Sequence, residues 1–181
     1  MTGRRTLAFA ALAAVTGCSD LNLPDPAFAN AVDTVTLGSA TSPPVHLASA
    51  YSIPDHRVVR TDQPRAFDFV YLRAGGRRLL VPLAALGLGA RSANPGLQQS
   101  TVGFDALVDP PNDGYVTSDS LAVAVGDVVV ARSRVVCFLG VPQYAKLEVL
   151  GFDDAAGTMR FRVVANVNCG YRSLALGLPD E

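Results

Sequence analysis

The stretch YAKLEVLGFDDAAGTMRFRVVAN, residues 144–166, carries the strongest fold signal in the chain. Apolar and charged residues alternate in both halves, and the loop DDAAG lies between them. The apolar positions are Ala145, Leu147, Val149, Met159, Phe161 and Val163, and the charged positions are Lys146, Glu148, Arg160 and Arg162. Successive side chains on a strand point to opposite faces. The pattern therefore predicts a β-hairpin with one face in a core and one charged face in water, with Glu148 near Arg160 or Arg162.

Most of the remaining chain is made of short β-branched runs separated by proline or glycine. They predict strands over residues 33–37, 45–53, 57–61, 66–73, 77–81, 121–125, 128–133 and 134–139, with 102–107 as a further candidate for pairing. Gly75 and Gly76 predict a two-residue hairpin turn, because such turns need positive φ. Residues 83–88 predict one or two helical turns. The fold class expected is all-β, an antiparallel β-sandwich or partly open barrel with little helix.

The first residues of the chain have the pattern of an export signal. Arg4 and Arg5 precede nine apolar residues, 7–15, and the small residues Thr16 and Gly17 lead to Cys18. Nine helical residues span only about 14 Å, too short for a bilayer core of about 30 Å. Residues 1–17 are therefore predicted to be a signal peptide that is removed.

The sequence Val15-Thr16-Gly17-Cys18 resembles the lipobox of bacterial lipoproteins. The resemblance implies that the Cys18 sulfur takes a diacylglyceryl group and that the chain is cut before this residue. Ser19, in the place where an acidic residue favours inner-membrane retention, favours the outer membrane of the cell envelope. The expected organisation is a signal peptide over 1–17, a proline-containing tether over 18–31 and a single β domain over 32–181.

Removal of residues 1–17 from the 181-residue chain leaves 164 residues with 13 basic and 16 acidic side chains, a formal charge of −3. Nothing in this balance indicates a nucleic-acid partner. With Cys18 used for lipid, Cys137 and Cys169 remain in a compartment where disulfides persist, so we expect them to pair. Closing a loop of this length contributes about 3 to 4 kcal/mol in the chain-entropy model.

The segments GDVVVARS and YAKLEVLGFDDAAGTMRFRVVAN, within residues 126–166, resemble the C-terminal part of the HmuY-like haemophore lipoproteins. This resemblance implies an all-β, secreted or lipid-anchored domain and, in the founding type, haem held by two histidines. The chain has only His46 and His56, and neither matches a ligand position of that family. Haem is thus a cofactor implied by the resemblance alone.

A cluster of arginines surrounds the predicted Gly75-Gly76 turn. Arg73 and Arg78 should lie directly opposite each other, with Arg77 beside them, and like charges so placed repel. An anion would relieve the repulsion, whether a carboxylate of this chain, a haem propionate, a phosphate headgroup or a partner protein. The alternative is that the arginines extend separately into water.

Other chemistry-bearing residues favour ordinary surface roles. His56, beside Asp55, predicts a solvated loop histidine, and His46 a surface residue of an early strand. The aspartate-rich residues 109–120 would place Pro111 and Ser120 where a calcium-binding loop of the EF-hand type needs an oxygen ligand and a glutamate. They therefore predict an ordinary surface loop and no metal site of that type, with an irregular calcium site as the alternative. No group of acid, base and nucleophile is evident, and the chain is not expected to be an enzyme.

Two functional hypotheses follow from these patterns. The first is a lipid-anchored envelope module that binds a small hydrophobic or anionic ligand such as haem. The second is a structural or interaction subunit of an envelope complex that has no small-molecule ligand.

Overall fold

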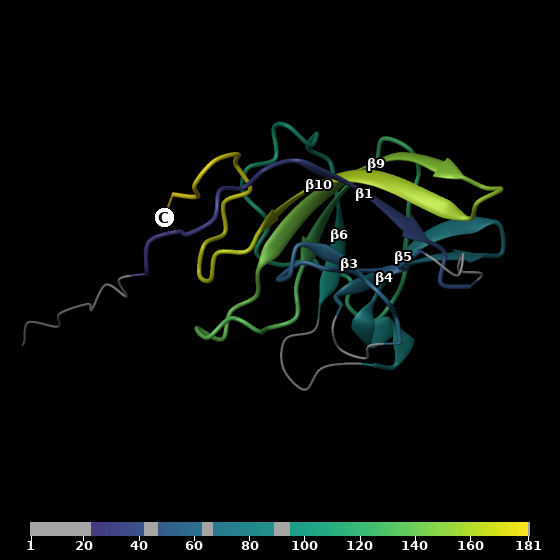
Figure 1. Cartoon of the computed structure of the whole chain (residues 1–181), viewed down its shortest axis with the longest axis horizontal. Helices are drawn as coiled ribbons and strands as arrows, with labels where there is room; N and C mark the ends of the chain where they lie inside the picture. The colour runs from purple at the N-terminus through teal and green to yellow at the C-terminus, as the bar shows by residue number, and fades with distance from the viewer. Residues whose placement is uncertain (1–22, 42–46, 63–66, 89–94, 181) are drawn as a thin grey trace, which may run out of the picture.

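The computed structural model describes residues 23–41, 47–62, 67–88 and 95–180, and these form two antiparallel five-stranded sheets (Figure 1). The first sheet has the order β1-β10-β9-β8-β6. Its strands are β1 (Asp33–Gly38), β6 (Gly96–Ser100), β8 (Val128–Arg132), β9 (Tyr144–Asp153) and β10 (Thr158–Asn166). The second sheet has the order β3-β2-β4-β5-β7. Its strands are β2 (Ala50–Ser52), β3 (Arg57–Val59), β4 (Phe69–Ala74), β5 (Arg77–Pro82) and β7 (Leu121–Ala122). The chain is an all-β sandwich, as the alternation predicted.

The main core lies between the inner faces of the two sheets. The apolar positions of the β9–β10 hairpin are all buried and pack against aromatic residues of the second sheet. Phe161 meets Tyr51 edge to face with 5.8 Å between ring centroids. Burial of each large side chain contributes about 1.5 to 3 kcal/mol, so the predicted apolar face is the main attachment between the sheets.

The outer face of the hairpin differs from the prediction at Lys146, whose side chain is only 3% exposed. Residues 103–117 fold over this face and contribute Phe104 and Leu107 to a second apolar cluster. The Lys146 ammonium donates to the Leu107 carbonyl over 2.7 Å and lies 5.0 Å from the Phe104 ring centroid. Burial lowers the pKa of Lys146, and Asp105 partly opposes the shift. The prediction of a charged face in water was wrong here, whereas Arg160 is exposed as expected.

Several turns and pairings agree with the sequence patterns. Gly75 and Gly76 have φ of 57° and 76° and form the β4–β5 turn. The predicted helical segment is a single 3-10 turn, η1, over Leu83–Leu86. Glu148 lies directly opposite Arg162, and their side chains form an ion pair.

The structure contradicts two predicted strands. Residues 134–139 form a loop, because the Arg134 amide bonds to a carboxylate of the other sheet and Cys137 is tied to Cys169. Residues 102–107 form turns. The Cys137–Cys169 disulfide, with 5.5 Å between Cα atoms, confirms the predicted pair.

One strand, β6, has no counterpart among the predicted elements, because its sequence GLQQS carries little apolar signal. It pairs with β8 along its whole length. Gly96 allows this, since a Cβ there would lie 2.7 Å from Tyr115 Cβ. A side chain at this position would push β6 away from residues 115–117.

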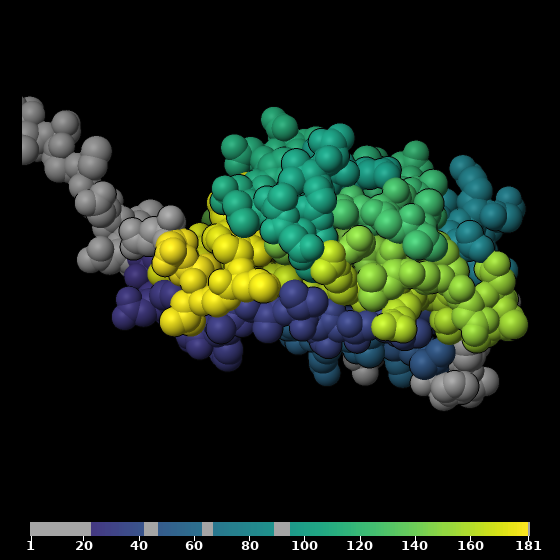
Figure 2. Space-filling view, turned by 90° about the horizontal axis from the view of Figure 1, so that it is seen from above, coloured from purple at the N-terminus to yellow at the C-terminus, as the bar shows by residue number. Residues whose placement is uncertain are grey.

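The beginning and end of the described chain lie side by side, at the left of Figure 1 and in purple and yellow in Figure 2. The amides of Ala27 and Phe28 donate to Asn168 Oδ1, and Asn30 pairs with Gly177. Part of the segment assigned to the tether is thus bonded to the C-terminal loops. The β4–β5 and β9–β10 turns lie at the opposite end of the sandwich.

No helix within the described ranges has the length and apolar character needed to cross a bilayer. The predicted signal peptide, Cys18 and His46 lie outside these ranges.

Candidate functional site: an arginine cleft

The predicted arginine cluster is formed at the tip of the β4–β5 hairpin. Arg73 and Arg78 are direct cross-strand partners. Asp154, from the β9–β10 turn, reaches between them: its Oδ2 lies 2.8 Å from Arg78 Nη2 and its Oδ1 lies 3.6 Å from Arg73 Nη2. Arg73 Nη1 also donates to the Asp154 carbonyl over 2.8 Å. A carboxylate of this chain therefore relieves the predicted repulsion.

An open cleft of about 450 Å³ lies between the two hairpin tips. Its lining includes Arg73, Arg77, Arg78 and Asp154, so three positive charges face one negative charge, a balance of +2. Arg77 is exposed, and within the described part of the chain no carboxylate forms an ion pair with it. The cleft thus keeps an excess of guanidinium donors after its own carboxylate is counted.

Hydrogen bonds from the β1 end hold one wall of the cleft in place. The Arg73 amide donates to Ser39 Oγ over 3.0 Å, and Thr41 Oγ1 donates to the Arg73 carbonyl over 3.0 Å. The two hydroxyl oxygens lie 2.8 Å apart and share a hydrogen bond. The backbone of Arg73 is therefore bonded on both sides, which limits its movement when the cleft is empty.

An aromatic pair supports the other wall. The Arg78 guanidinium lies 4.3 Å above the ring centroid of Phe152, and Phe152 stacks on Tyr71 at 6.1 Å. Burial raises the pKa of the Tyr71 phenol, and the charges of Arg73 and Arg78 partly oppose this. The buried hydroxyl has no hydrogen-bond partner among the residues described. It stays neutral at neutral pH, so it leaves the positive balance of the cleft unchanged.

Sequence reasoning located the arginines and missed the residues that complete the cleft. Asp154 comes from the DDAAG loop, and Ser39 and Thr41 follow β1. The only sequence signal for Asp154 was its place in a hairpin turn. Its approach to Arg78 depends on the packing of one sheet on the other.

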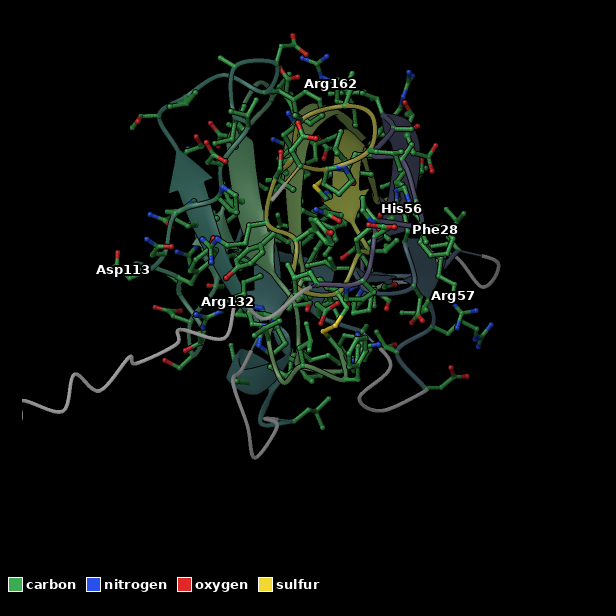
Figure 3. The ribbon with its side chains drawn as sticks, turned by 90° about the vertical axis from the view of Figure 1, so that its left-hand side faces the viewer. Phe28, His56, Arg57, Asp113, Arg132 and Arg162 are labelled. Carbon is green, nitrogen blue, oxygen red and sulfur yellow. A yellow bond between two sulfur atoms is a disulfide. The ribbon has the colours of Figure 1, made fainter. Side chains whose placement is uncertain are left out.

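His56 and Asp55 do not form an acid–base pair. His56 packs edge to face on Tyr51, with 6.4 Å between centroids, and its Nε2 is buried without a partner among the described atoms (Figure 3). His56 lies in a turn, with φ of 46°, as the loop prediction expected, and it is half-buried, so it is only partly solvated. The Asp55 carboxylate bonds instead to Ser52 and Arg134.

The described residues of the cleft do not supply the usual ligands of haem iron. The cleft lining contains no histidine, methionine or cysteine. Met159 is fully buried in the core, Cys137 and Cys169 are used in the disulfide, and the free nitrogen of His56 faces the protein interior. Among the described residues, none of the side chains that line the cleft is of the kind that commonly ligates haem iron.

Residues 109–120 follow the surface-loop prediction. The Tyr115 hydroxyl donates to the Pro111 carbonyl, and Asp119 accepts from the Ser120 amide. The described residues include no group of three or more side chains of the kinds that hold a metal ion.

Comparison of the chain with protein-family models, with curated proteins and with solved structures returned no match.

Proposed function

We propose that this chain is an exported, lipid-anchored binding protein of the cell envelope that takes a small polyanion in the arginine cleft. One observation carries the ligand assignment: three arginines line the cleft, and a single carboxylate faces them. Arg73 and Arg78 share the Asp154 carboxylate, and no carboxylate among the described residues forms an ion pair with Arg77. A ligand with two or more negative charges matches this excess.

The chemistry of guanidinium narrows the ligand class. Its planar donors bind carboxylate and phosphate oxygens in pairs, and such hydrogen bonds are stronger than those between neutral groups. The volume of about 450 Å³ lies within the usual range of small-molecule sites. The cleft is polar and open, and the described residues that line it include no histidine, methionine or cysteine. The proposed ligands are therefore small di- or tricarboxylates and phosphate esters.

The lipid anchor is the second part of the proposal, and it rests on the Val15-Thr16-Gly17-Cys18 sequence. Mass spectrometry of the chain recovered from bacterial membranes should give an N-terminus at Cys18 that carries acyl groups. Cys18→Ala should leave the signal uncut and the acyl mass absent. An N-terminus elsewhere, without acyl groups, would contradict the anchor and leave the ligand proposal standing.

Calorimetric titration tests the cleft with citrate and pyrophosphate as probes at low salt. Arg77→Ala should weaken binding about 10-fold or more, because a hydrogen bond to a charged group contributes about 1.5 to 3 kcal/mol. Arg60→Ala is the control, since Arg60 is also exposed but pairs with Asp62, which does not line the cleft. Haemin should produce no Soret shift at the cleft.

The ligand proposal fails if neither anion binds, or if Arg77→Ala and Arg60→Ala bind equally well. A partner protein that co-purifies from membranes in that case would favour the interaction-subunit hypothesis.

A further inference from the structure

The end of the sandwich that holds the first and last described residues exposes several large apolar side chains. The exposed phenylalanines among the described residues are Phe28, at 61%, and Phe138, at 76%. Phe28 lies at this end (Figure 3), and Phe138 follows Cys137, which the disulfide ties to the C-terminal segment. Leu139, Leu176 and Leu178 are also exposed here. Other large apolar residues are exposed elsewhere, among them Leu88, Val125 and Leu150. Single exposed apolar residues are normal, whereas a group of large apolar side chains at one end of the molecule marks an interaction surface.

The protruding part of this surface is a short loop, residues 136–141, between β8 and β9. The disulfide from Cys137 to Cys169 ties the loop to the C-terminal segment. Leu139 lies beside Leu23, since side-chain atoms of both lie within 3.0 Å of the place where a Cβ on Gly170 would stand. The loop therefore sits directly next to the first residue that the structure describes.

Covalent geometry then limits how far this surface can be from Cys18. Leu23 is five residue steps after Cys18, and a fully extended chain advances at most about 3.6 Å per step. The Leu23 Cα can thus lie no more than about 18 Å from the Cα of Cys18. If Cys18 is at a bilayer surface, the apolar end is held within that distance of it.

We propose that the 136–141 loop and Phe28 insert into the interfacial zone of the bilayer in which Cys18 is anchored. The inference rests on the proposed lipid anchor and goes beyond the proposed ligand site. A lipid surface is the chosen occupant because the short tether brings it to this end, and because exposed Phe and Leu side chains partition into the headgroup and acyl boundary, to a depth of about 5 to 10 Å.

The docking would fix the orientation of the domain. Strand β9 starts at Tyr144, next to the loop, and ends at Asp153, next to the cleft. Ten residues at about 3.3 Å each give a length of about 33 Å. With the loop in the membrane, the arginine cleft faces away from it, and its anion then comes from the aqueous compartment and is not a headgroup of the same membrane.

The experiment uses the absence of tryptophan from the chain. The chain starting at Cys18 is coupled through that thiol to a maleimide lipid in phosphatidylcholine vesicles, which anchors it whether or not cells acylate it. Phe138→Trp places a single indole fluorophore at the loop, and its high exposure makes the change tolerable. Val125→Trp, also exposed and next to the opposite end of β8, is the matched control.

When the Phe138→Trp variant is coupled to vesicles, its indole emission should shift to the blue. Brominated lipid should then quench most of its emission intensity. The Val125→Trp variant should show neither change. Equal emission from the two variants, or no quenching of Phe138→Trp in vesicles that carry the protein, would overturn the docking proposal. Adding Leu139→Asp to the Phe138→Trp variant should reduce the quenching. Failure of acylation in cells is measured separately by mass, so the two proposals fail independently.

Discussion

Asp68 and Arg134 join the two sheets of the sandwich through one buried carboxylate. Asp68 Oδ1 accepts the Arg134 amide at 2.7 Å, and its Oδ2 lies 3.1 Å from Arg134 Nη1 and accepts the Ile53 amide at 2.7 Å. Asp68, 1% exposed, precedes β4 in the second sheet, and Arg134 follows β8 in the first. Burial raises the pKa of Asp68, although the charge of Arg134 and the two backbone donors oppose the shift.

Asp68→Asn should lower the free energy of unfolding by about 3 to 5 kcal/mol, the usual cost of breaking a buried ion pair by removing one partner. The amide nitrogen would also face a backbone N–H in place of an acceptor. Urea unfolding followed by circular dichroism measures the loss. Arg60→Ala, which removes an exposed ion pair, should cost no more than about 1 kcal/mol. Equal losses for Asp68→Asn and Arg60→Ala would show that the Asp68–Arg134 ion pair contributes little to the free energy of unfolding.

Gly96→Ala should destabilise the protein by about 1 to 3 kcal/mol, because its Cβ would collide with Tyr115 Cβ and overpacking has about this cost. Gly103→Ala is the control, since a Cβ there meets no atom within 4 Å. Thermal unfolding of the two variants side by side checks the difference. If Gly96→Ala leaves the unfolding temperature unchanged, β6 can shift to make room for the added methyl group.

Loss of the disulfide in a Cys137→Ser, Cys169→Ser double variant should lower stability by about 3 to 4 kcal/mol under oxidising conditions, in line with the loop it closes. Reduction of the wild-type protein with dithiothreitol should have a similar effect, and the double variant should not respond to it. A double variant as stable as the wild type would show that the 136–141 loop is held by packing alone.

Lys146 should make stability depend on pH in the alkaline range. Because burial lowers its folded-state pKa below the unfolded value of 10.5, the unfolded state binds this proton more readily. The free energy of unfolding should rise with pH between the lowered pKa and that value. Lys146→Met lacks this group, so the wild type should gain stability relative to the variant as pH rises. If the difference in free energy of unfolding between the wild type and Lys146→Met does not change with pH, the pKa of Lys146 is not lowered in the folded protein.

Asp154→Asn should strengthen pyrophosphate binding about 10-fold, because it removes the one negative charge that competes for Arg73 and Arg78. Calorimetry at two salt concentrations checks both the gain and its electrostatic origin, which salt screens. Asp62→Asn, remote from the cleft, should change nothing. Weaker binding in Asp154→Asn would indicate that the carboxylate is needed to hold the arginines in place.

The sequence by itself determined the all-β class, the β9–β10 hairpin, the Gly75-Gly76 turn and the Cys137–Cys169 pair. These features depend on periodicity within one strand, on turn chemistry or on the number of cysteines, and all of them can be read locally. The predictions for the signal peptide and Cys18 are of the same local kind.

Tertiary structure alone decided which charged residues are buried and which meet. Lys146 has the sequence context of a surface residue, yet a loop well before it in the chain covers it, with a separation of 39 residues between Lys146 and its partner Leu107. Asp154 meets Arg78 across a separation of 76 residues. Alternation along a strand specifies which side chains share a face, but what covers that face depends on how distant segments pack, so the cleft and the apolar end emerge only in the folded sandwich.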